Sequence, residues 1–374
     1  MSAVEDTPVF IIAEAGVNHN GSLAMARELV HAAAEAGADA VKFQTFDTAK
    51  LVLASAATAD YQRRNMRGAD NQHAMLKALE LDRDAHFELR DLCRTVGIEF
   101  MSSGFDPASV AFLAEEVGVA RLKIPSGEIV NGPLLLRAAR TGLPLIVSTG
   151  MCTLDEVLEC LSLIAWAARH PQGTPAGRAA LAAVRAAADW AAPLAAGTWL
   201  LHCVTQYPAP PEATNLRAMA TLGRATGLRV GLSDHSEGRH IAVAAVAAGA
   251  TVLEKHFSLS RRLPGPDHVA SLEPDELAAM VQEVRDVEKA LGSGEKVPLD
   301  MELRNRIPAR GSLVAARPIR AGEPFSLDNV TTKRPGNGVS PLLYWDVVGG
   351  QRATRDYAAD EQLEPAPAAG GAGT

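Results

Sequence analysis

Two lysines and three serines each end or follow a short apolar run, and their side chains suit an anionic ligand. They are Lys42, Lys123, Ser126, Ser148 and Ser233. Lysine ammonium groups and serine hydroxyls bind phosphate and carboxylate. The turns at 126–128 (SGE) and 148–150 (STG) are rich in small residues, which lets backbone N–H groups approach an anion. These residues predict a binding site for phosphate and carboxylate groups.

Two histidines and two glutamates occupy similar positions and suggest the accompanying chemistry. His235 and His256 could bind a divalent metal through their imidazole nitrogens, with water or substrate completing the coordination. Such a metal would polarise a carbonyl group. Glu14 and Glu128 could orient a sugar hydroxyl or move a proton. A structural role for the two histidines is the alternative, and Asp267 could cap the helix expected at 273 or stabilise a turn.

A repeated pattern of helix, glycine and apolar strand would position these side chains. Short apolar strands follow Gly37, Gly97, Gly118, Gly142, Gly227 and Gly249, and two more are expected at 9–14 and 198–203. Helices are expected near 22–36, 82–96, 107–116, 131–140, 153–165, 215–225, 239–248 and 273–291. This order and length predict an α/β fold, a TIM (β/α)8 barrel. A doubly wound sheet is the alternative, but no GxGxxG follows the first strand.

Nearly every predicted strand ends in a polar group, and a TIM barrel gathers strand ends at its catalytic face. The groups are Glu14, Lys42, Gln44, Ser102, Ser103, Lys123, Ser126, Glu128, Ser148, His202, Ser233, His235 and His256. Lys42 and Gln44 share parity, as do Ser233 and His235, so each pair faces one side of its strand. We therefore expect one polar ring at the mouth of the barrel.

The remaining segments suggest a second, smaller domain. We expect the barrel over 1–291, with an Ala-rich insertion at 165–197 that contains a helix around 176–191. A linker at 292–311 precedes β-like pieces that predict a small β-rich domain over 312–364. The tail, 365–374, has the composition of a disordered end.

Composition excludes several classes of protein. The chain has 374 residues, 47% of them hydrophobic and 21% charged, with a net charge of −8, which disfavours nucleic acid as a partner. The apolar run 241–253 is too short to cross a membrane. The four cysteines have no CxxC pairing and the N-terminus is acidic, so we expect reduced thiols and a cytoplasmic location.

Longer stretches, in order from residue 9 to about 350, resemble a known family, the sialic acid synthases. They are IIAEAGVNHNGSL, AGADAVKFQTF, KIPSGEIVNGPLL, IVSTGM, LLHCVTQYPAP, VGLSDHS, LEKHFSL, RLPGPDHVASLEPDEL and KRPGNGVSP. The resemblance implies a TIM barrel followed by a small antifreeze-like (SAF) domain. It also implies a swapped homodimer, in which the small domain of one chain reaches over the barrel mouth of the other.

The resemblance implies a role for each matching residue. Lys42, Lys123, Ser126, Ser148 and Ser233 would hold phosphoenolpyruvate, and His235 and His256 would bind a divalent metal, manganese, with magnesium or cobalt as alternatives. Glu14, Gln44, Tyr207 and Asp267 would receive the open-chain sugar, and Glu128 would take part in the water or proton steps. Arg334 would contact the acyl-amino sugar of the partner subunit. The implied product is a nine-carbon keto acid.

The identity of the acceptor sugar stays open at this point. N-acetylmannosamine is the leading prediction, and a 2,4-diacetamido sugar, as in legionaminic acid synthases, is its closest rival. Within 61–76, Asn65, Arg67 and Asn71 compete for one sugar contact. Two other classes compete with the synthase: a Schiff-base aldolase that uses Lys42 or Lys123, and a non-catalytic protein on an inactive barrel.

Overall fold

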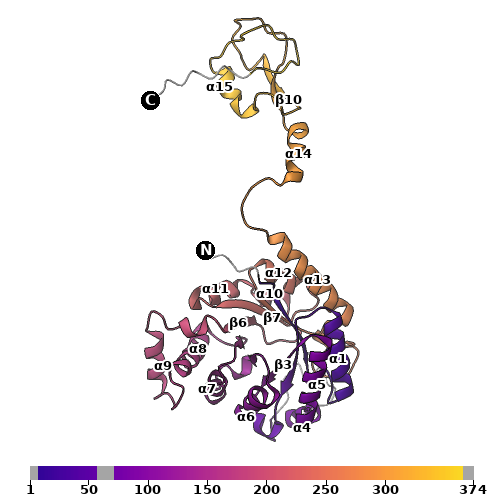
Figure 1. The fold of residues 1–374 in the computed structure, drawn as a ribbon, viewed down its shortest axis with the longest axis vertical. Helices are drawn as coiled ribbons and strands as arrows, with labels where there is room; N and C mark the ends of the chain where they lie inside the picture. Colours follow the sequence, from indigo (N-terminus) through magenta and orange to yellow (C-terminus); the bar gives the residue numbers. More distant parts are fainter. Residues whose placement is uncertain (1–6, 57–70, 365–374) are drawn as a thin grey trace. The chain divides into compact units, whose positions relative to one another are not determined.

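A closed barrel of parallel strands forms the larger part of the protein (Figure 1). The computed structural model describes residues 7–56 and 71–364. Neighbours in the barrel follow the chain order β1-β2-β3-β4-β5-β6-β7-β8, and β8 pairs with β1. The strands are β1 (Phe10–Gly16), β2 (Ala40–Thr45), β3 (Glu99–Gly104), β4 (Leu122–Ile124), β5 (Leu145–Ser148), β6 (Thr198–Cys203), β7 (Arg229–Asp234) and β8 (Val252–His256). The predicted TIM barrel is confirmed.

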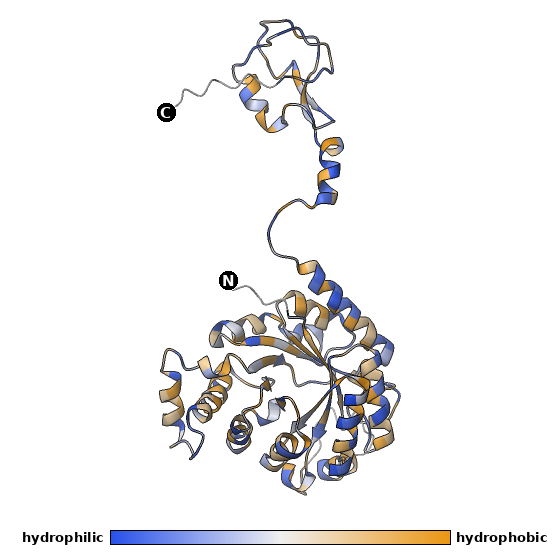
Figure 2. Ribbon diagram, viewed as in Figure 1, coloured by the Kyte–Doolittle hydropathy of each residue, from blue (hydrophilic) through white to orange (hydrophobic). Residues whose placement is uncertain are grey.

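Helices connect successive strands around the outside of the barrel. The expected helices are α1 (Leu23–Glu35), α5 (Arg83–Val96), α6 (Pro107–Ala111), α7 (Gly132–Arg140), α8 (Leu154–Arg169), α11 (Arg217–Thr226), α12 (His240–Ala247) and α13 (Pro274–Leu291). α6 continues as a π-helical turn, Phe112–Val117. Among the described residues of the barrel, three short helices were not predicted: α2 (Thr48–Leu51), α4 (Gln72–Leu79) and α10 (Pro211–Thr214). Figure 2 shows hydrophilic and hydrophobic residues side by side along the helices, as amphipathic helices require.

The glycines that were predicted to precede strands all have positive φ. They are Gly37, Gly97, Gly118, Gly142, Gly227 and Gly249. Gly97, for example, has φ 83° and donates its N–H to the carbonyl of Cys93, which closes the last turn of α5. A left-handed residue there lets the chain leave the helix and enter the next strand within a few residues.

Along the strands, the side chains that point into the barrel change from apolar to polar between one layer and the next. One layer is formed by Ile12, Ala40, Met101, Ile146, Leu201 and Val252, all buried. Two residues further along the same strands lie Glu14, Lys42, Ser103, Ser148, Cys203 and Glu254. Because side chains alternate between faces, both layers point inward. The apolar layer closes the barrel below, and the polar layer forms the floor of its mouth.

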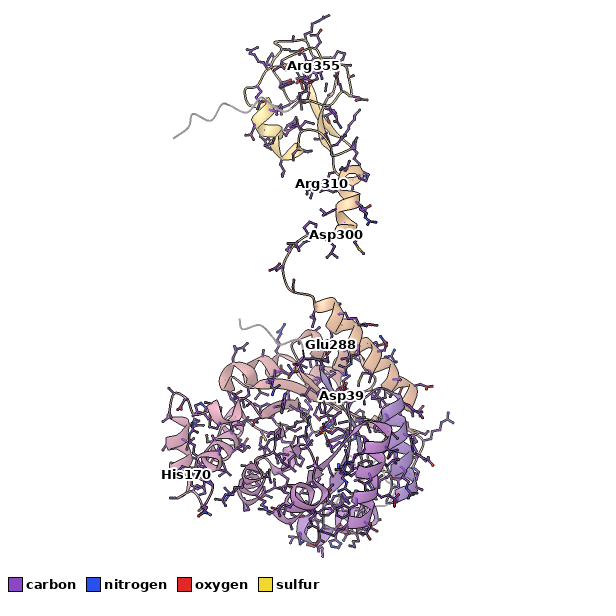
Figure 3. The ribbon with its side chains drawn as sticks, viewed as in Figure 1. Asp39, His170, Glu288, Asp300, Arg310 and Arg355 are labelled. Atoms are coloured by element: carbon purple, nitrogen blue, oxygen red, sulfur yellow. The ribbon has the colours of Figure 1, made fainter. Side chains whose placement is uncertain are left out.

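The last helix of the barrel, α13, contacts residues at the N-terminal ends of the first two strands. Arg285 of α13 donates to Oδ2 of Asp39 at 2.9 Å and to the carbonyl of Val9 at 2.8 Å. Arg285 also pairs with Glu288 at 3.2 Å, and Figure 3 labels both acidic residues. The ends of the barrel segment are therefore joined to each other.

The Ala-rich insertion contains less helix than the sequence predicts. α9 spans Arg178–Arg185, and a 3-10 turn follows at Ala192–Leu194, so the helix expected around 176–191 is shorter. α9 packs against α8, and Arg178 donates to Glu159 at 2.6 Å. Pocket-lining residues of the barrel mouth do not come from this segment.

Residues from Ser293 onward form a separate compact unit, and Met1–Gly292 form the other. The smaller unit contains an antiparallel pair, β9 (Ser312–Ala315) and β10 (Val330–Lys333), around a core that includes Leu313, Phe325 and Tyr357. Two helices after residue 292 were not predicted: α14 spans Asp300–Ala309 within the predicted linker, and α15 spans Tyr344–Val348. The predicted tail, 365–374, lies outside the described residues. Among those described, no helix is both long and apolar enough to cross a membrane.

Candidate active site

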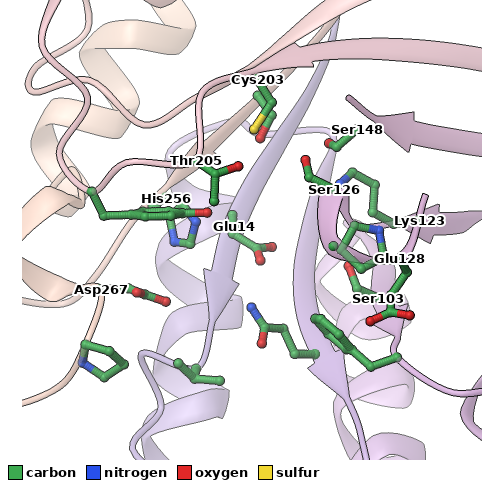
Figure 4. Close-up of a pocket in the computed structure, with 18 of the residues that line it drawn as sticks. Glu14, Ser103, Lys123, Ser126, Glu128, Ser148, Cys203, Thr205, His256 and Asp267 are labelled. Carbon is green, nitrogen blue, oxygen red and sulfur yellow. The ribbon is translucent and has the colours of Figure 1, made fainter. Parts of the chain in front are cut away.

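A cavity of about 380 Å³ opens at the C-terminal ends of the barrel strands. All barrel residues to which the resemblance gives a role line it: Glu14, Lys42, Gln44, Lys123, Ser126, Glu128, Ser148, Tyr207, Ser233, His235, His256 and Asp267. Figure 4 shows side chains from several strands converging on one space, among them Glu14, Lys123, Ser126, Ser148 and His256. Arg334 belongs to the smaller unit, where it is exposed.

The floor of the cavity holds two buried lysines joined by one carboxylate. Oε1 of Glu254 lies 3.5 Å from Nζ of Lys123, and Oε2 lies 3.6 Å from Nζ of Lys42. Ser233 donates its hydroxyl to Glu254 at 3.1 Å, and Lys42 donates to Ser103 at 3.1 Å. All five side chains are buried. Glu254 is not among the site residues predicted from the sequence.

The side chains of the cavity floor shift one another's pKa values, because they are buried and close to one another. Burial would raise the pKa of Glu254, but Lys123 and Lys42 outweigh it and lower that pKa to about 2. Burial would lower the pKa of Lys42, but Glu14 and Glu254 outweigh it, so that pKa is raised. For Lys123 burial prevails and the pKa is lowered. Glu254 is therefore an anion at neutral pH and Lys42 a cation.

Glu14 stands beside Lys42 but has a different protonation behaviour. Its Oε2 lies 2.7 Å from Nζ of Lys42. Burial raises the pKa of Glu14 to about 7, because desolvation and the charge of Glu254 together exceed the attraction of Lys42. A carboxyl group that titrates near neutrality can either accept or donate a proton.

The predicted metal ligands, His235 and His256, lie on adjacent strand ends with ring centroids 5.3 Å apart. Nδ1 of His235 lies 2.7 Å from the carbonyl of Val204, which can only accept, so Nδ1 carries the hydrogen and Nε2, 3.5 Å from the hydroxyl of Ser233, is the candidate ligand atom. Among the described residues, Nδ1 of His256 has no hydrogen-bond partner. Burial lowers the pKa of His256 well below its usual value, which keeps the ring neutral. Both rings therefore fit metal ligation.

A third ligand from the protein is not evident in the described ranges, 7–56 and 71–364. No group of three or more His, Cys, Asp and Glu side chains there could hold a metal ion. That water or substrate would complete the coordination of the two histidines stays a prediction.

The serines and the STG turn present small groups to the cavity. Ser126 accepts a hydrogen bond from the N–H of Gly150 at 3.0 Å, which links the two predicted anion-binding turns. A Cβ at Gly150 would lie 2.5 Å from Oγ1 of Thr205, so a glycine is required for this close approach. The buried hydroxyl of Ser148 has no hydrogen-bond partner among the described residues. These groups leave donors available for a ligand.

The residues predicted to face a sugar also reach the cavity. The ring of Tyr207 lies 4.1 Å from that of His235, centroid to centroid. Asp267 is 7% exposed, and burial raises its pKa to about 6. The helix-cap alternative for Asp267 is wrong, since Glu273 caps α13. Glu128 is half-buried and accepts from the amide of Asn131 at 2.6 Å.

Two strand-end residues point away from the cavity, contrary to expectation. Ser102 is hydrogen-bonded to Thr45 at 2.7 Å, and Nε2 of His202 lies 2.7 Å from the carbonyl of Thr214. Each is one residue out of phase with an inward neighbour, Ser103 and Cys203, so the alternation of the strand directs it outward. The prediction that Ser102 and His202 belong to the polar ring is therefore wrong.

Of the three residues within 61–76 that could make the predicted sugar contact, only one lies among the described residues. Asn65 and Arg67 lie outside them. Asn71 caps α4: its side chain accepts from the N–H of Ala74 and donates to the carbonyl of Ala54, both at 3.0 Å. Its neighbour Gln72 lines the cavity instead.

Two cavity residues, Glu254 and Cys203, were missed although a signal for them exists. Glu254 precedes His256 by two positions, as Ser233 precedes His235, and parity places both members of each pair on one face. Cys203 likewise lies two positions after Leu201, which points into the barrel.

Comparison with known proteins covers both units of the chain. The NeuB family model matches residues 29–296 and the SAF domain model residues 310–366. An N,N'-diacetyllegionaminic acid synthase from Legionella pneumophila is 46% identical over 345 residues, which span 91% of this chain and 89% of that protein. The N-acetylneuraminate-9-phosphate synthase of Mus musculus is 34% identical over 331 residues, spanning 87% and 83%. The crystal structure of an N-acetylneuraminic acid synthetase from Leptospira borgpetersenii in complex with citrate has a TM-score of 0.65 at 32% identity and covers 80% of this chain and 90% of that one.

Proposed function

The chain belongs to the NeuB family and carries a SAF domain, and from this we propose that it is a nonulosonic acid synthase. It condenses phosphoenolpyruvate with an acyl-amino sugar to give a nine-carbon 2-keto-3-deoxy acid and phosphate. The observation that carries the proposal is the pair of buried lysines, Lys42 and Lys123, beside two buried histidines, His235 and His256, in one cavity. An anionic substrate and a carbonyl substrate can meet there.

Phosphoenolpyruvate would be held by the floor of the cavity. Lys42 and Lys123 supply positive charge, and Ser126, Ser148 and Ser233 supply hydroxyl donors. The unpaired hydroxyl of Ser148 and the glycine-lined STG turn support this assignment. In a water-poor cavity each of these contacts is stronger than in solution.

A divalent cation, manganese or in its place magnesium or cobalt, would be held by His235 and His256. When bound it polarises the aldehyde of the sugar as a Lewis acid. The contact of Nδ1 of His235 with Val204, which leaves Nε2 to face a ligand, and the unpartnered Nδ1 of His256 support this assignment. The hydrogen bond from His235 to Val204 fixes the orientation of that ring before any ligand arrives.

The protein would then orient the reactants and move protons. C3 of phosphoenolpyruvate attacks the aldehyde carbon of the open-chain sugar, and the aldehyde oxygen takes up a proton. Water adds at C2, and phosphate leaves from the resulting tetrahedral carbon. Glu14, with a pKa near 7, and Glu128 at the mouth of the cavity are the groups we assign to these proton steps. Orientation in one cavity supplies much of the acceleration.

The acceptor would lie against Gln44, Tyr207 and Asp267, and we assign it to the 2,4-diacetamido class. The legionaminic acid synthase is 46% identical to this chain, whereas the N-acetylneuraminate-9-phosphate synthase is 34% identical. This difference in identity favours a 2,4-diacetamido sugar over N-acetylmannosamine, which was the leading prediction from the sequence. The functional unit would be a swapped homodimer in which Arg334 of one chain contacts the sugar bound by the other.

A phosphate-release assay tests the function. Purified protein with phosphoenolpyruvate and Mn²⁺ is offered N-acetylmannosamine and 2,4-diacetamido sugars, and sugar-dependent release of phosphate is expected. Borohydride trapping of a substrate on lysine, with activity that survives EDTA, would instead identify the Schiff-base aldolase. No release with any sugar would refute the synthase and favour the non-catalytic alternative.

A further inference from the structure

One side of the cavity is apolar, which the proposed chemistry does not explain. Its members form a small hydrophobic cluster separate from the barrel core. We call this cluster the apolar wall: Val17, Leu51, Met75, Leu76, Leu79 and Phe105, all of which line the cavity. Phosphoenolpyruvate is charged at both ends and has almost no surface that gains from such contact.

The wall is built around one face of α4. Gln72, Met75, Leu76 and Leu79 are spaced i, i+3, i+4 and i+7, so they project from the same side of the helix. All of them line the cavity. α4 therefore presents the amide group of Gln72 to the cavity, with the apolar side chains of the same face beside it.

An acetamido group has the matching pattern, since an amide N–H and C=O are joined to a methyl group. Gln72 can donate to the carbonyl or accept from the N–H, and the methyl group gains from burial against Met75 and Leu76. The hydroxyl that N-acetylmannosamine carries at position 4 gains nothing there, because an apolar surface cannot replace its hydrogen bonds to water.

The position of the wall relative to the reacting carbon selects the substituent. C1 of the sugar must lie with the lysines and histidines, and C4 lies three bonds further along the open chain. The wall is contributed by segments that follow β1, β2 and β3, beyond the polar layer that Glu14, Lys42 and Ser103 form on those strands. The distal acylamino group reaches the wall more readily than the one at position 2.

We propose that the apolar wall and Gln72 form the receptor for the acylamino group at position 4 of the acceptor, and so select a diacylamino sugar. This inference rests on the proposed synthase function and names the residues that determine its substrate. Leu76 is half-buried at the cavity surface, so it can be changed with less effect on folding than Met75 or Leu79, which are buried.

The test compares two sugars that differ at one position, 2,4-diacetamido-2,4-dideoxymannose and N-acetylmannosamine. In Leu76→Ala, kcat/KM for the diacetamido sugar is expected to fall about 10-fold, since contacts of this size in an apolar pocket are worth that much. Values for N-acetylmannosamine and the KM for phosphoenolpyruvate are expected to change less than about twofold. Leu76→Met, which conserves volume, should restore the preference.

Leu53→Ala is the matched control, because Leu53 is 78% exposed, lies near the wall in sequence and does not line the cavity. Equal losses for both sugars in Leu76→Ala, or no loss, would overturn the assignment. Calorimetric binding of the two corresponding alditols, which cannot react, separates this inference from the proposed function. Selective, Leu76-dependent binding without phosphate release would refute the synthase and keep the receptor. Absence of selective alditol binding would refute the receptor even in an active enzyme.

Discussion

Glu254 and Lys123 form an ion pair inside the barrel, with 3.5 Å between Oε1 and Nζ and both side chains buried. The same carboxylate also approaches Lys42. Without a ligand, Glu254 is thus the shared counter-ion of two cations that we assign to phosphoenolpyruvate. Its presence explains how two lysine side chains remain buried in the cavity floor.

Glu254→Gln is expected to destabilise the ligand-free protein by about 3 kcal/mol or more, because it leaves two buried ammonium groups with less negative charge. Phosphoenolpyruvate should reduce this deficit, since its anionic groups replace the missing charge. Thermal unfolding with and without phosphoenolpyruvate measures both effects. Glu295→Gln, at an exposed position, is the control. A deficit that phosphoenolpyruvate leaves unchanged would contradict the counter-ion role.

His235→Ala and His256→Ala are expected to abolish tight binding of Mn²⁺ without unfolding the barrel. His202→Ala is the matched control, because His202 also ends a strand but is bonded to Thr214 outside the cavity. Metal content after dialysis against Mn²⁺, together with circular dichroism, checks the expectation. Retention of wild-type metal content by the His235/His256 double variant would disprove the assignment.

Glu14 should make the ligand-free protein less stable as pH rises. Its folded pKa, about 7, is above the ordinary value of 4.5, so between these pH values the folded protein keeps a proton that the unfolded chain has lost. The free energy of unfolding therefore falls with pH across this window. Glu14→Gln lacks this titrating group, so its free energy of unfolding relative to the wild type should rise from pH 5 to about pH 8.

Urea unfolding at several pH values, without metal or phosphoenolpyruvate, measures the difference between the two proteins. Glu295→Gln controls for the loss of a negative charge at an exposed site. If the difference between Glu14→Gln and the wild type does not vary with pH, the raised pKa of Glu14 is refuted.

The swapped dimer can be tested by mixing two inactive variants. Lys123→Met impairs the cavity but keeps the small domain, and Arg334→Ala does the reverse. If Arg334 acts on the partner's cavity, subunit exchange creates one intact site in each mixed dimer, and about a quarter of wild-type activity should return. Activity that stays at the level of the separate variants would argue that Arg334 does not act across the dimer.

The barrel and most of its site follow from local patterns in the sequence. Glycines with left-handed φ mark the helix ends, and apolar segments mark the buried strands, because both reflect local backbone geometry and burial. The period of two then orients side chains: Ile12 and Glu14 face inward together, as do Val252 and Glu254. Applied to every strand, this rule would have included Glu254 and excluded Ser102 and His202.

Other properties depend on distances between segments far apart in the chain. The sequence alone shows Lys42, Lys123 and Glu254 on three separate strands, but closure of the barrel is what brings one carboxylate between two ammonium groups. The pKa of Glu14 rises because burial removes water from it, and burial is a property of the folded chain. The apolar wall likewise exists only where α4 packs over the barrel mouth. Local chemistry determined which residues could act, and tertiary packing decided their charges, their partners and the side of the cavity that each one faces.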